Sequence, residues 1–279
     1  MDFVQILMPA LALITLMVLT HTYLGLHVLE RGIIFVDLAV AQVAALGMSI
    51  AFLAGLDAHG VAAQLYAIAA TLSAAVGLAF LRRARDKTTR EVAIGCVYVI
   101  ATALAIVILS RTNQGMEELK GMLNGNVIWV RWEEVGIMFV VYSILGCLYF
   151  RLHERFLNLS TNHESQKGHF GWEFMFFASF AVIITLAVNL AGVLLVFASL
   201  IIPAFTATFL TETFKKRLML GWFLGWLGAL GGLIVSYEAD LPTGSSVVCA
   251  LGVLPIVALV VRYIRRRNKG KLIRRRGVA

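Results

Sequence analysis

The sequence predicts an all-α, polytopic membrane protein, a transmembrane helical bundle of eight to nine spans, and two observations support this fold class. Of the 279 residues, 60% are hydrophobic and only 14% are charged, against roughly 25% charged residues in an average soluble domain. Uncharged stretches of about 20 residues recur along the chain, which is the length that a helix needs to cross a hydrocarbon core of roughly 30 Å. We therefore assign residues 1–264 to one transmembrane domain and residues 265–279 to a basic tail.

Nine apolar segments are candidate spans. The first lacks a basic start and is longer than the apolar run of a cleaved signal sequence, so we expect a retained span. The sixth and seventh share 37 uncharged residues between Phe174 and Leu210, whereas two full spans and a turn need slightly more than about 40. We therefore expect one of these two to be short or re-entrant. The nine segments are residues 4–29, 33–56, 61–81, 92–110, 135–150, 174–190, 192–210, 218–236 and 245–264.

The distribution of lysine and arginine predicts the orientation, because these residues accumulate in loops that stay in the cytoplasm. With the N-terminus outside and nine crossings, 21 of the 24 lysines and arginines lie inside, the C-terminal tail included. The loops near Asp57 and Asp240 contain acids but neither lysine nor arginine, and we place them outside.

The net charge of +8 could attract nucleic acid. A basic cluster directly after a last span more simply fixes topology and contacts anionic lipid, so we expect membrane lipid and no nucleic acid as partner.

Several motifs of catalysis and energy use are absent from the sequence. It contains no G-x-x-x-x-G-K-[ST] phosphate loop, no H-E-x-x-H and no G-x-S-x-G. We therefore expect that this chain is not an enzyme and binds no cofactor. Energy for any active transport must then come from another polypeptide. Cys96, Cys147 and Cys249 all fall in apolar runs and have neither the even number nor the spacing of a disulfide framework.

Five short stretches, taken in order, carry a resemblance to a known family. Together they resemble the permease family of bacterial zinc, manganese and iron ABC importers in sequence and spacing, over about residues 25–255. The stretches are Gly25 to Arg31 leading into Phe35 to Gln42; Arg90 to Gly95; Leu123 to Ile128; Gly192 to Val196 followed by Leu200 to Ala207; and Asp240 to Gly244.

The resemblance implies a fold like that of the vitamin B12 permease and a location in the bacterial cytoplasmic (inner) membrane. It implies a homodimer of this chain, two separate ATPase subunits that use the ATP, and an extracytoplasmic metal-binding protein that delivers the ion. The implied cargo is a divalent transition metal, with zinc expected ahead of manganese or iron. The implied mechanism is alternating access, in which the ATPase subunits drive two copies of the chain between outward-open and inward-open states.

Asp37 is the first candidate metal contact. A carboxylate in a span costs about 2.5 to 3.5 kcal/mol at the centre and normally faces a cavity, a partner charge or the bundle interior. Where the family has Ser-His after its aspartate, this chain has Val40-Ala41 followed by Gln42. A tight hairpin around residue 31 would bring His21 level with Gln42, so we hypothesise that Asp37, His21 and Gln42 contact the metal. The alternative is that His21 hydrogen-bonds a backbone carbonyl and that Asp37 caps a helix or pairs with Arg31.

The other candidate residues form three groups, and for each group a functional interpretation competes with a simpler structural one. Asn189, Ser199 and Thr206 lie in the 174–210 region with Pro203, which interrupts helical hydrogen bonding. This fits either a pathway lining or a kinked packing helix, and the family resemblance favours the lining. Glu238 and Asp240 would concentrate cations at the entrance, or are merely solvated. The segment 151–171 is where the family docks its ATPase, although only its position and glycines fit the family pattern. Its candidate coupling residues are Asn162, Glu164, Gln166 and Gly168.

Three rival functions remain open from the sequence. An ion-gradient-driven secondary transporter would more often show inverted repeats, and no convincing internal repeat is present. Because the family histidine is replaced, an ABC permease for a metal chelate or a vitamin is a second alternative. An intramembrane enzyme or assembly factor is the third.

Overall fold

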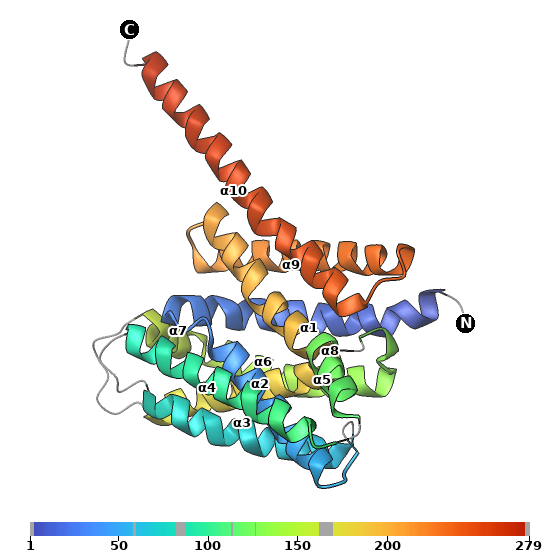
Figure 1. Cartoon of the computed structure of the whole chain (residues 1–279). Coiled ribbons are helices and arrows are strands. Elements are labelled where there is room, and N and C mark those ends of the chain that lie inside the picture. The colour runs from blue at the N-terminus through green and yellow to red at the C-terminus, as the bar shows by residue number, and fades with distance from the viewer. Residues whose placement is uncertain are drawn as a thin grey trace.

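Helices are the only regular elements in the part of the chain that the computed structural model describes, which is residues 3–57, 60–81, 87–112, 114–125, 127–161 and 170–276. Long helices run side by side through the bundle, while the short α5 and α7 lie toward opposite ends of it (Figure 1). The elements are α1 (Phe3–Arg31), α2 (Val36–Leu53), α3 (Val61–Leu81), α4 (Lys87–Leu109), α5 (Gly115–Asn124), η1 (Val127–Trp129), α6 (Trp132–Arg151), α7 (His153–Thr161), α8 (Phe170–Leu210), α9 (Phe214–Glu238) and α10 (Thr243–Arg276).

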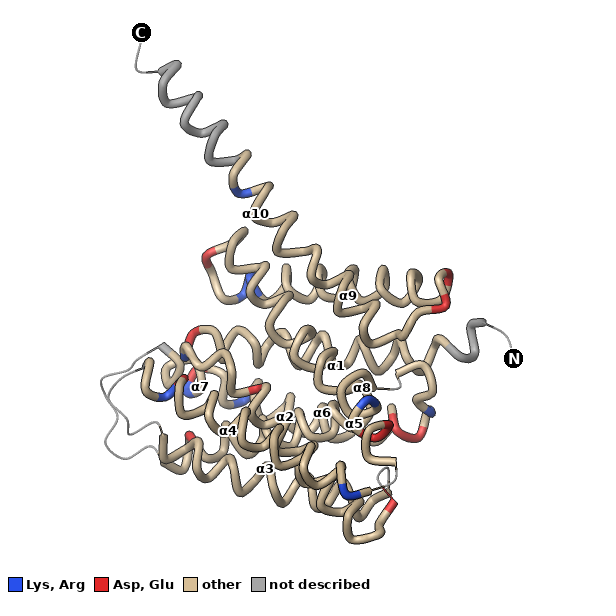
Figure 2. Tube along the Cα trace, viewed as in Figure 1, with Lys and Arg blue, Asp and Glu red and all other residues tan. Residues whose placement is uncertain are grey.

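Eight of these helices are long and apolar enough to cross a membrane: α1 to α4, α6 and α8 to α10. Charged residues gather near the ends of the helices and leave the middle of the bundle almost free of them (Figure 2). The predicted fold class, an all-α transmembrane bundle, is therefore confirmed.

The 41-residue helix α8 consists of two antiparallel arms that meet at Gly192, whose φ of 76° and ψ of 159° are not helical. In the first arm, Glu173 pairs with Arg31 at the end of α1. In the second arm, Ser199 bonds His21 and Leu200 lies beside Gly25, so this arm runs parallel to α1.

Counting the two arms separately turns the eight long helices into nine crossing segments within the described chain. The single residue Gly192 makes the turn, so no separate loop is needed between an arm over 170–191 and a shorter arm over 193–210. That one of the two is short or re-entrant in the membrane stays a prediction. The first arm also begins at Phe170, four residues before the predicted start.

Helix α2 lies in the core, and small side chains make this possible. Its sequence is rich in alanine, and its buried residues lie on all sides of the helix. A Cβ on Gly47 would lie 2.7 Å from the Cα of Ala67, so α2 and α3 touch through their backbones. Without a hydrophobic driving force between helices in lipid, such close packing is a main source of association.

Helix α9 lies against α1 and α8, and α10 lies against α8 and α9 (Figure 1). A Cβ on Gly225 would lie 2.9 Å from Val18 and 3.0 Å from Pro203, so α9 fits closely against both. Trp222 adds a hydrogen bond of 2.8 Å from its Nε1 to the carbonyl oxygen of Leu19. Helix α10 extends beyond the rest of the bundle (Figure 1). Only 17% of its most apolar 18-residue stretch is buried against the other helices.

Candidate functional site

Asp37 is a fully buried carboxylate in the first turn of α2. Its exposure is 0%, and neither carboxylate oxygen has a hydrogen-bond partner within the described residues. Asp37 does not pair with Arg31, as one interpretation of the sequence required. Arg31 instead forms an ion pair with Glu173 at 2.8 Å. A buried charge without a partner is strongly unfavourable, so Asp37 has the properties of a group that receives a cation or a proton.

His21 is also fully buried, and both of its ring nitrogens are engaged. Nδ1 lies 2.8 Å from the hydroxyl of Ser199, and Nε2 lies 3.1 Å from the hydroxyl of Tyr142. Ser199 can donate to the carbonyl of Val196 at 2.8 Å, and Tyr142 can donate either to Nε2 or to the carbonyl of Ile183 at 3.3 Å, so the donor at each ring nitrogen depends on the tautomer. The imidazole therefore bonds two hydroxyls rather than a backbone carbonyl, and Tyr142 must move before Nε2 can reach a cation.

Tyr142 is a residue that the sequence did not single out, and it connects the two candidates. It bonds His21, and it lies close enough to Asp37 for an electrostatic interaction. Gln42 is buried at 5% exposure but does not share this face of the helix. Gln42 follows Asp37 by five residues, which corresponds to about 140° of rotation beyond a full helical turn. Ala41 follows Asp37 by four residues and therefore lies on the same face as Asp37.

Two of the predicted pathway residues, Ser199 and Pro203, lie at contacts between helices. Ser199 bonds His21, and Pro203 packs against Gly225 of α9. Thr206 donates to the carbonyl of Ile202 in its own helix at 2.7 Å. Asn189, near the end of the first arm of α8, is half-buried.

A cavity of about 780 Å³ opens near the end of the bundle that contains α5 and the turn between α9 and α10. Asp240, one of the two predicted entrance residues, lines this cavity, whereas Glu238 is exposed beside the turn. The cavity also contains Glu117 and Lys120 of α5. Sequence reasoning missed Glu117, although the adjacent acids Glu117 and Glu118 before the Leu123 stretch were a visible signal.

Three glycines from three segments meet next to this cavity, and we call them the glycine junction: Gly125, Gly192 and Gly244. Gly125 and Gly192 have positive φ angles of 65° and 76°. A Cβ on Gly192 would lie 2.6 Å from the carbonyl carbon of Asn124, and one on Gly244 would press on the Asn124 oxygen. The end of α5, the reversal in α8 and the start of α10 therefore touch backbone to backbone.

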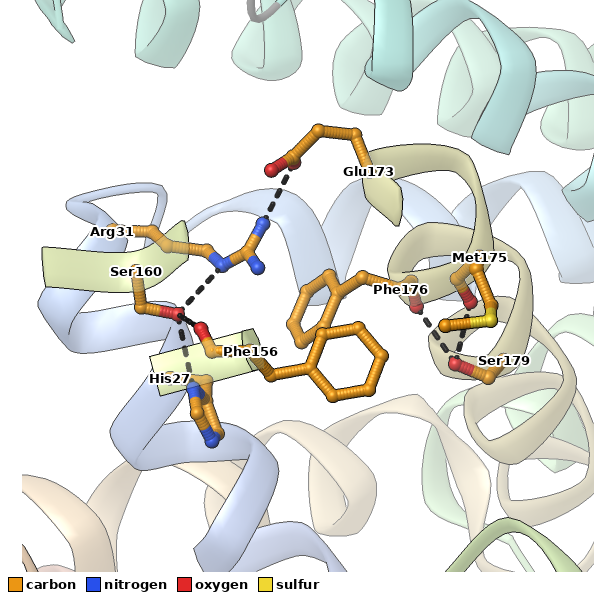
Figure 3. Close-up of polar contacts among 8 residues, drawn as sticks. All are labelled: His27, Arg31, Phe156, Ser160, Glu173, Met175, Phe176 and Ser179. Carbon is orange, nitrogen blue, oxygen red and sulfur yellow. Dashed lines mark hydrogen bonds and ion pairs between the residues drawn. The ribbon is translucent and has the colours of Figure 1, made fainter. Parts of the chain in front are cut away.

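At the opposite end of the bundle, a buried group of polar side chains joins α1, α7 and α8, and we call it the inner polar cluster: His27, Arg31, Ser160 and Glu173 (Figure 3). The Nε of Arg31 donates to the hydroxyl of Ser160 at 3.0 Å, and its Nη1 donates to Glu173 at 2.8 Å. His27 Nδ1 lies 3.0 Å from the same hydroxyl. The guanidinium lies 3.8 Å from the ring centroid of Phe176. The predicted coupling residues Asn162, Glu164, Gln166 and Gly168 lie outside the described residues.

Curated relatives match most of the chain. The manganese transport system membrane protein MntC of Listeria innocua is 27% identical over 246 residues, which covers 85% of this chain and 84% of that protein. A protein of Haemophilus influenzae named "Probable iron transport system membrane protein" is 26% identical over 252 residues, which covers 88% of this chain and 89% of that protein.

Two solved structures have the same fold. PsaBC from Streptococcus pneumoniae in complex with Fab matches with a TM-score of 0.73 and 20% identity, covering 91% of this chain and 92% of that one. The structure described as "An inward-facing conformation of a putative metal-chelate type ABC transporter" matches with a TM-score of 0.68 and 16% identity, covering 91% of this chain and 85% of that one. The family model described as the ABC 3 transport family matches residues 3–262. That match spans nearly the whole transmembrane bundle, so this chain belongs to the ABC 3 transport family and is a membrane subunit of a transporter, not an enzyme.

Proposed function

We propose that this chain is the permease subunit of an ATP-driven importer for a divalent transition metal. The observation that carries the proposal is Asp37, a carboxylate whose two oxygens are buried and have no hydrogen-bond partner among the described residues. The named relatives support the substrate class, since their names refer to manganese or iron transport. Family membership does not favour a gradient-driven transporter or an intramembrane enzyme.

Among the metals, we propose manganese first, then iron, and zinc last, which reverses the order expected from the resemblance. Carboxylate, carbonyl and water ligands suit manganese, whereas imidazole suits zinc and iron. The family histidine is replaced by Ala41, and the nearby imidazole of His21 is held by Ser199 and Tyr142. A carboxylate contact from Asp37 without a free imidazole therefore favours manganese, with iron as the second choice.

The proposed mechanism is alternating access by two copies of the chain. Asp37 is sealed at 0% exposure, so helices must separate before an ion can reach it from either side. We place the basic tail and α7 in the cytoplasm with the ATPase subunits, because lysine and arginine favour that side. The metal-binding delivery protein is placed at the outer cavity, where Asp240 and Glu117 would attract cations.

The test is metal uptake into proteoliposomes that contain the full complex. We expect Asp37→Asn to lower manganese uptake by at least about tenfold, the scale on which groups around a bound metal act. Asp57→Asn is the matched control, because it makes the same chemical change at an exposed outer position. Unchanged uptake by a correctly inserted Asp37→Asn complex would remove Asp37 from the pathway and refute the proposal.

A further inference from the structure

Helix α7 has a buried face that belongs to the bundle and an exposed face that does not. Phe156 and Ser160, one helical turn apart, are both 0% exposed. Glu154, Arg155 and Asn158 are exposed and form its charged and polar face. Because the sequence places this end of the bundle in the cytoplasm, the exposed face of α7 is available to a cytoplasmic partner.

The buried face of α7 is connected to α1 through one residue, Ser160. Its hydroxyl accepts from Arg31 and lies within hydrogen-bond distance of His27, both on α1, and it can donate to the Phe156 carbonyl at 2.8 Å. Through Arg31 the same connection reaches Glu173 at the start of α8 (Figure 3). The inner polar cluster thus ties α7 to the last turn of α1.

Arg31 is in turn connected to Asp37 by a short turn that is hydrogen-bonded at both ends. Arg31 is the last residue of α1, and α2 begins at Val36. The amide of Ile33 donates to the Val28 carbonyl at 3.3 Å, and the amide of Val36 donates to the Ile33 carbonyl at 3.1 Å. With so few residues in the turn, a displacement of Arg31 must shift the first turn of α2, which contains Asp37.

The other side of this turn is held by α4. The amide of Phe35 donates to the Glu91 carboxylate at 3.0 Å. The start of α2 therefore lies between a contact with α4 and a contact, through Arg31, with α7 and α8. A relative movement of these helices would act on the first turn of α2.

We propose that the inner polar cluster is a mechanical link, in which Arg31 and Ser160 are positioning residues that transmit movement of α7 to the first turn of α2 and Asp37. This inference rests on the proposed function in one respect, since it takes the exposed face of α7 as part of the ATPase docking surface. A buried ion pair is a weak source of stability, because apolar residues of the same volume often do as well or better. Arginine instead offers several donors in a rigid fork, so it fixes the direction of two partners at once.

The test is hydrogen exchange of the complete transporter complex in lipid nanodiscs, without nucleotide and after trapping with ATP and vanadate. In the wild type, exchange should differ between the two states at α7 and at residues 32–37. Ser160→Ala removes the acceptor shared by Arg31 and His27. Arg31→Lys keeps the charge opposite Glu173 but removes the Nε donor. In both variants the difference at residues 32–37 should fall by about tenfold, a size typical of coupling between distant sites, while the difference at α7 persists.

Ser179→Ala is the matched control, because Ser179 is also buried and bonds a neighbouring helix, through Tyr149 at 2.7 Å, but does not belong to the cluster. It should behave like the wild type, and retained ATPase activity identifies complexes that have assembled. The inference is overturned if residues 32–37 do not respond in the wild type, or if they respond in Ser160→Ala and Arg31→Lys as strongly as in the wild type. Since the readout does not involve the transported ion, a failure of manganese uptake would refute the proposed substrate without affecting this link.

Discussion

Replacing Gly192 by alanine should strongly destabilise the protein, because this residue combines an unusual backbone conformation with close backbone contacts. Gly192 makes the reversal in α8 with a φ of 76° and a ψ of 159°, a region that is essentially restricted to glycine. Non-glycine residues in such regions cost about 1 to 3 kcal/mol in backbone strain.

The added methyl group would also meet backbone atoms that have no freedom to move aside. Its carbon would press on the amide nitrogen of Gly125 and would lie 2.6 Å from the Asn124 carbonyl carbon and 2.7 Å from the Leu123 oxygen. Overpacking of this kind typically costs about 1 to 3 kcal/mol. Together with the backbone strain, we expect Gly192→Ala to lower the free energy of unfolding by about 2 to 6 kcal/mol.

The assay is thermal unfolding of the purified protein in detergent, together with the amount that inserts into the membrane. Gly121→Ala is the matched control, because Gly121 lies in α5 close to the same junction and has open space where a Cβ would point. In a helix this control should be neutral or stabilising by up to about 1 kcal/mol. If Gly192→Ala unfolded at the same temperature as Gly121→Ala, the glycine junction would not be the rigid contact described above.

Three further predictions concern the metal site, the entrance and the ion pairs. Ala41→His should raise zinc uptake relative to manganese, because it adds an imidazole on the Asp37 face of α2; an unchanged ratio of the two uptake rates would contradict the proposed metal contact at Asp37. Glu117→Gln with Asp240→Asn should slow the initial uptake rate at low ionic strength and have little effect at high salt, since steering by exposed charges is screened; equal slowing at both salt concentrations would argue against it. Glu30→Gln, which breaks a partly exposed ion pair with Arg217, should change the free energy of unfolding by less than about 1 kcal/mol. Glu173→Gln, at a buried pair, should lower it by about 3 to 5 kcal/mol, and similar thermal shifts in both variants would be inconsistent with the burial.

The fold class and nearly every span could be predicted from the sequence, because the length and polarity of a segment suffice when the solvent is lipid. The reversal in α8 could not be predicted in this way. A count of uncharged residues assumes a loop between spans, whereas a glycine with positive φ reverses the chain within one residue. Gly192 stood in a stretch with a family resemblance, but nothing in its local sequence distinguished a turn from a close helix contact.

The candidate site was predicted in part, and the missing part depends on long-range pairing. That Asp37 lies inside the bundle followed from the cost of a carboxylate in a span. Its lack of a hydrogen-bond partner did not follow, since Arg31, six residues before it, was the obvious partner. Arg31 instead pairs with Glu173, which is 142 residues away in the chain. No local pattern identifies such a partner, although Glu173 directly precedes the longest uncharged stretch of the sequence.

The two ends of the bundle are held by contacts of different mechanical character, and this difference suggests which end moves first. At the glycine junction, three backbones touch without intervening side chains, so small rotations of α5, α8 or α10 would produce clashes. In the inner polar cluster, hydrogen bonds of 2.8 to 3.0 Å connect long side chains that can exchange partners. Packed backbones move as rigid bodies, whereas polar contacts can switch between discrete arrangements. We therefore expect nucleotide-driven movement to begin at α7 and reach Asp37 before the glycine junction responds.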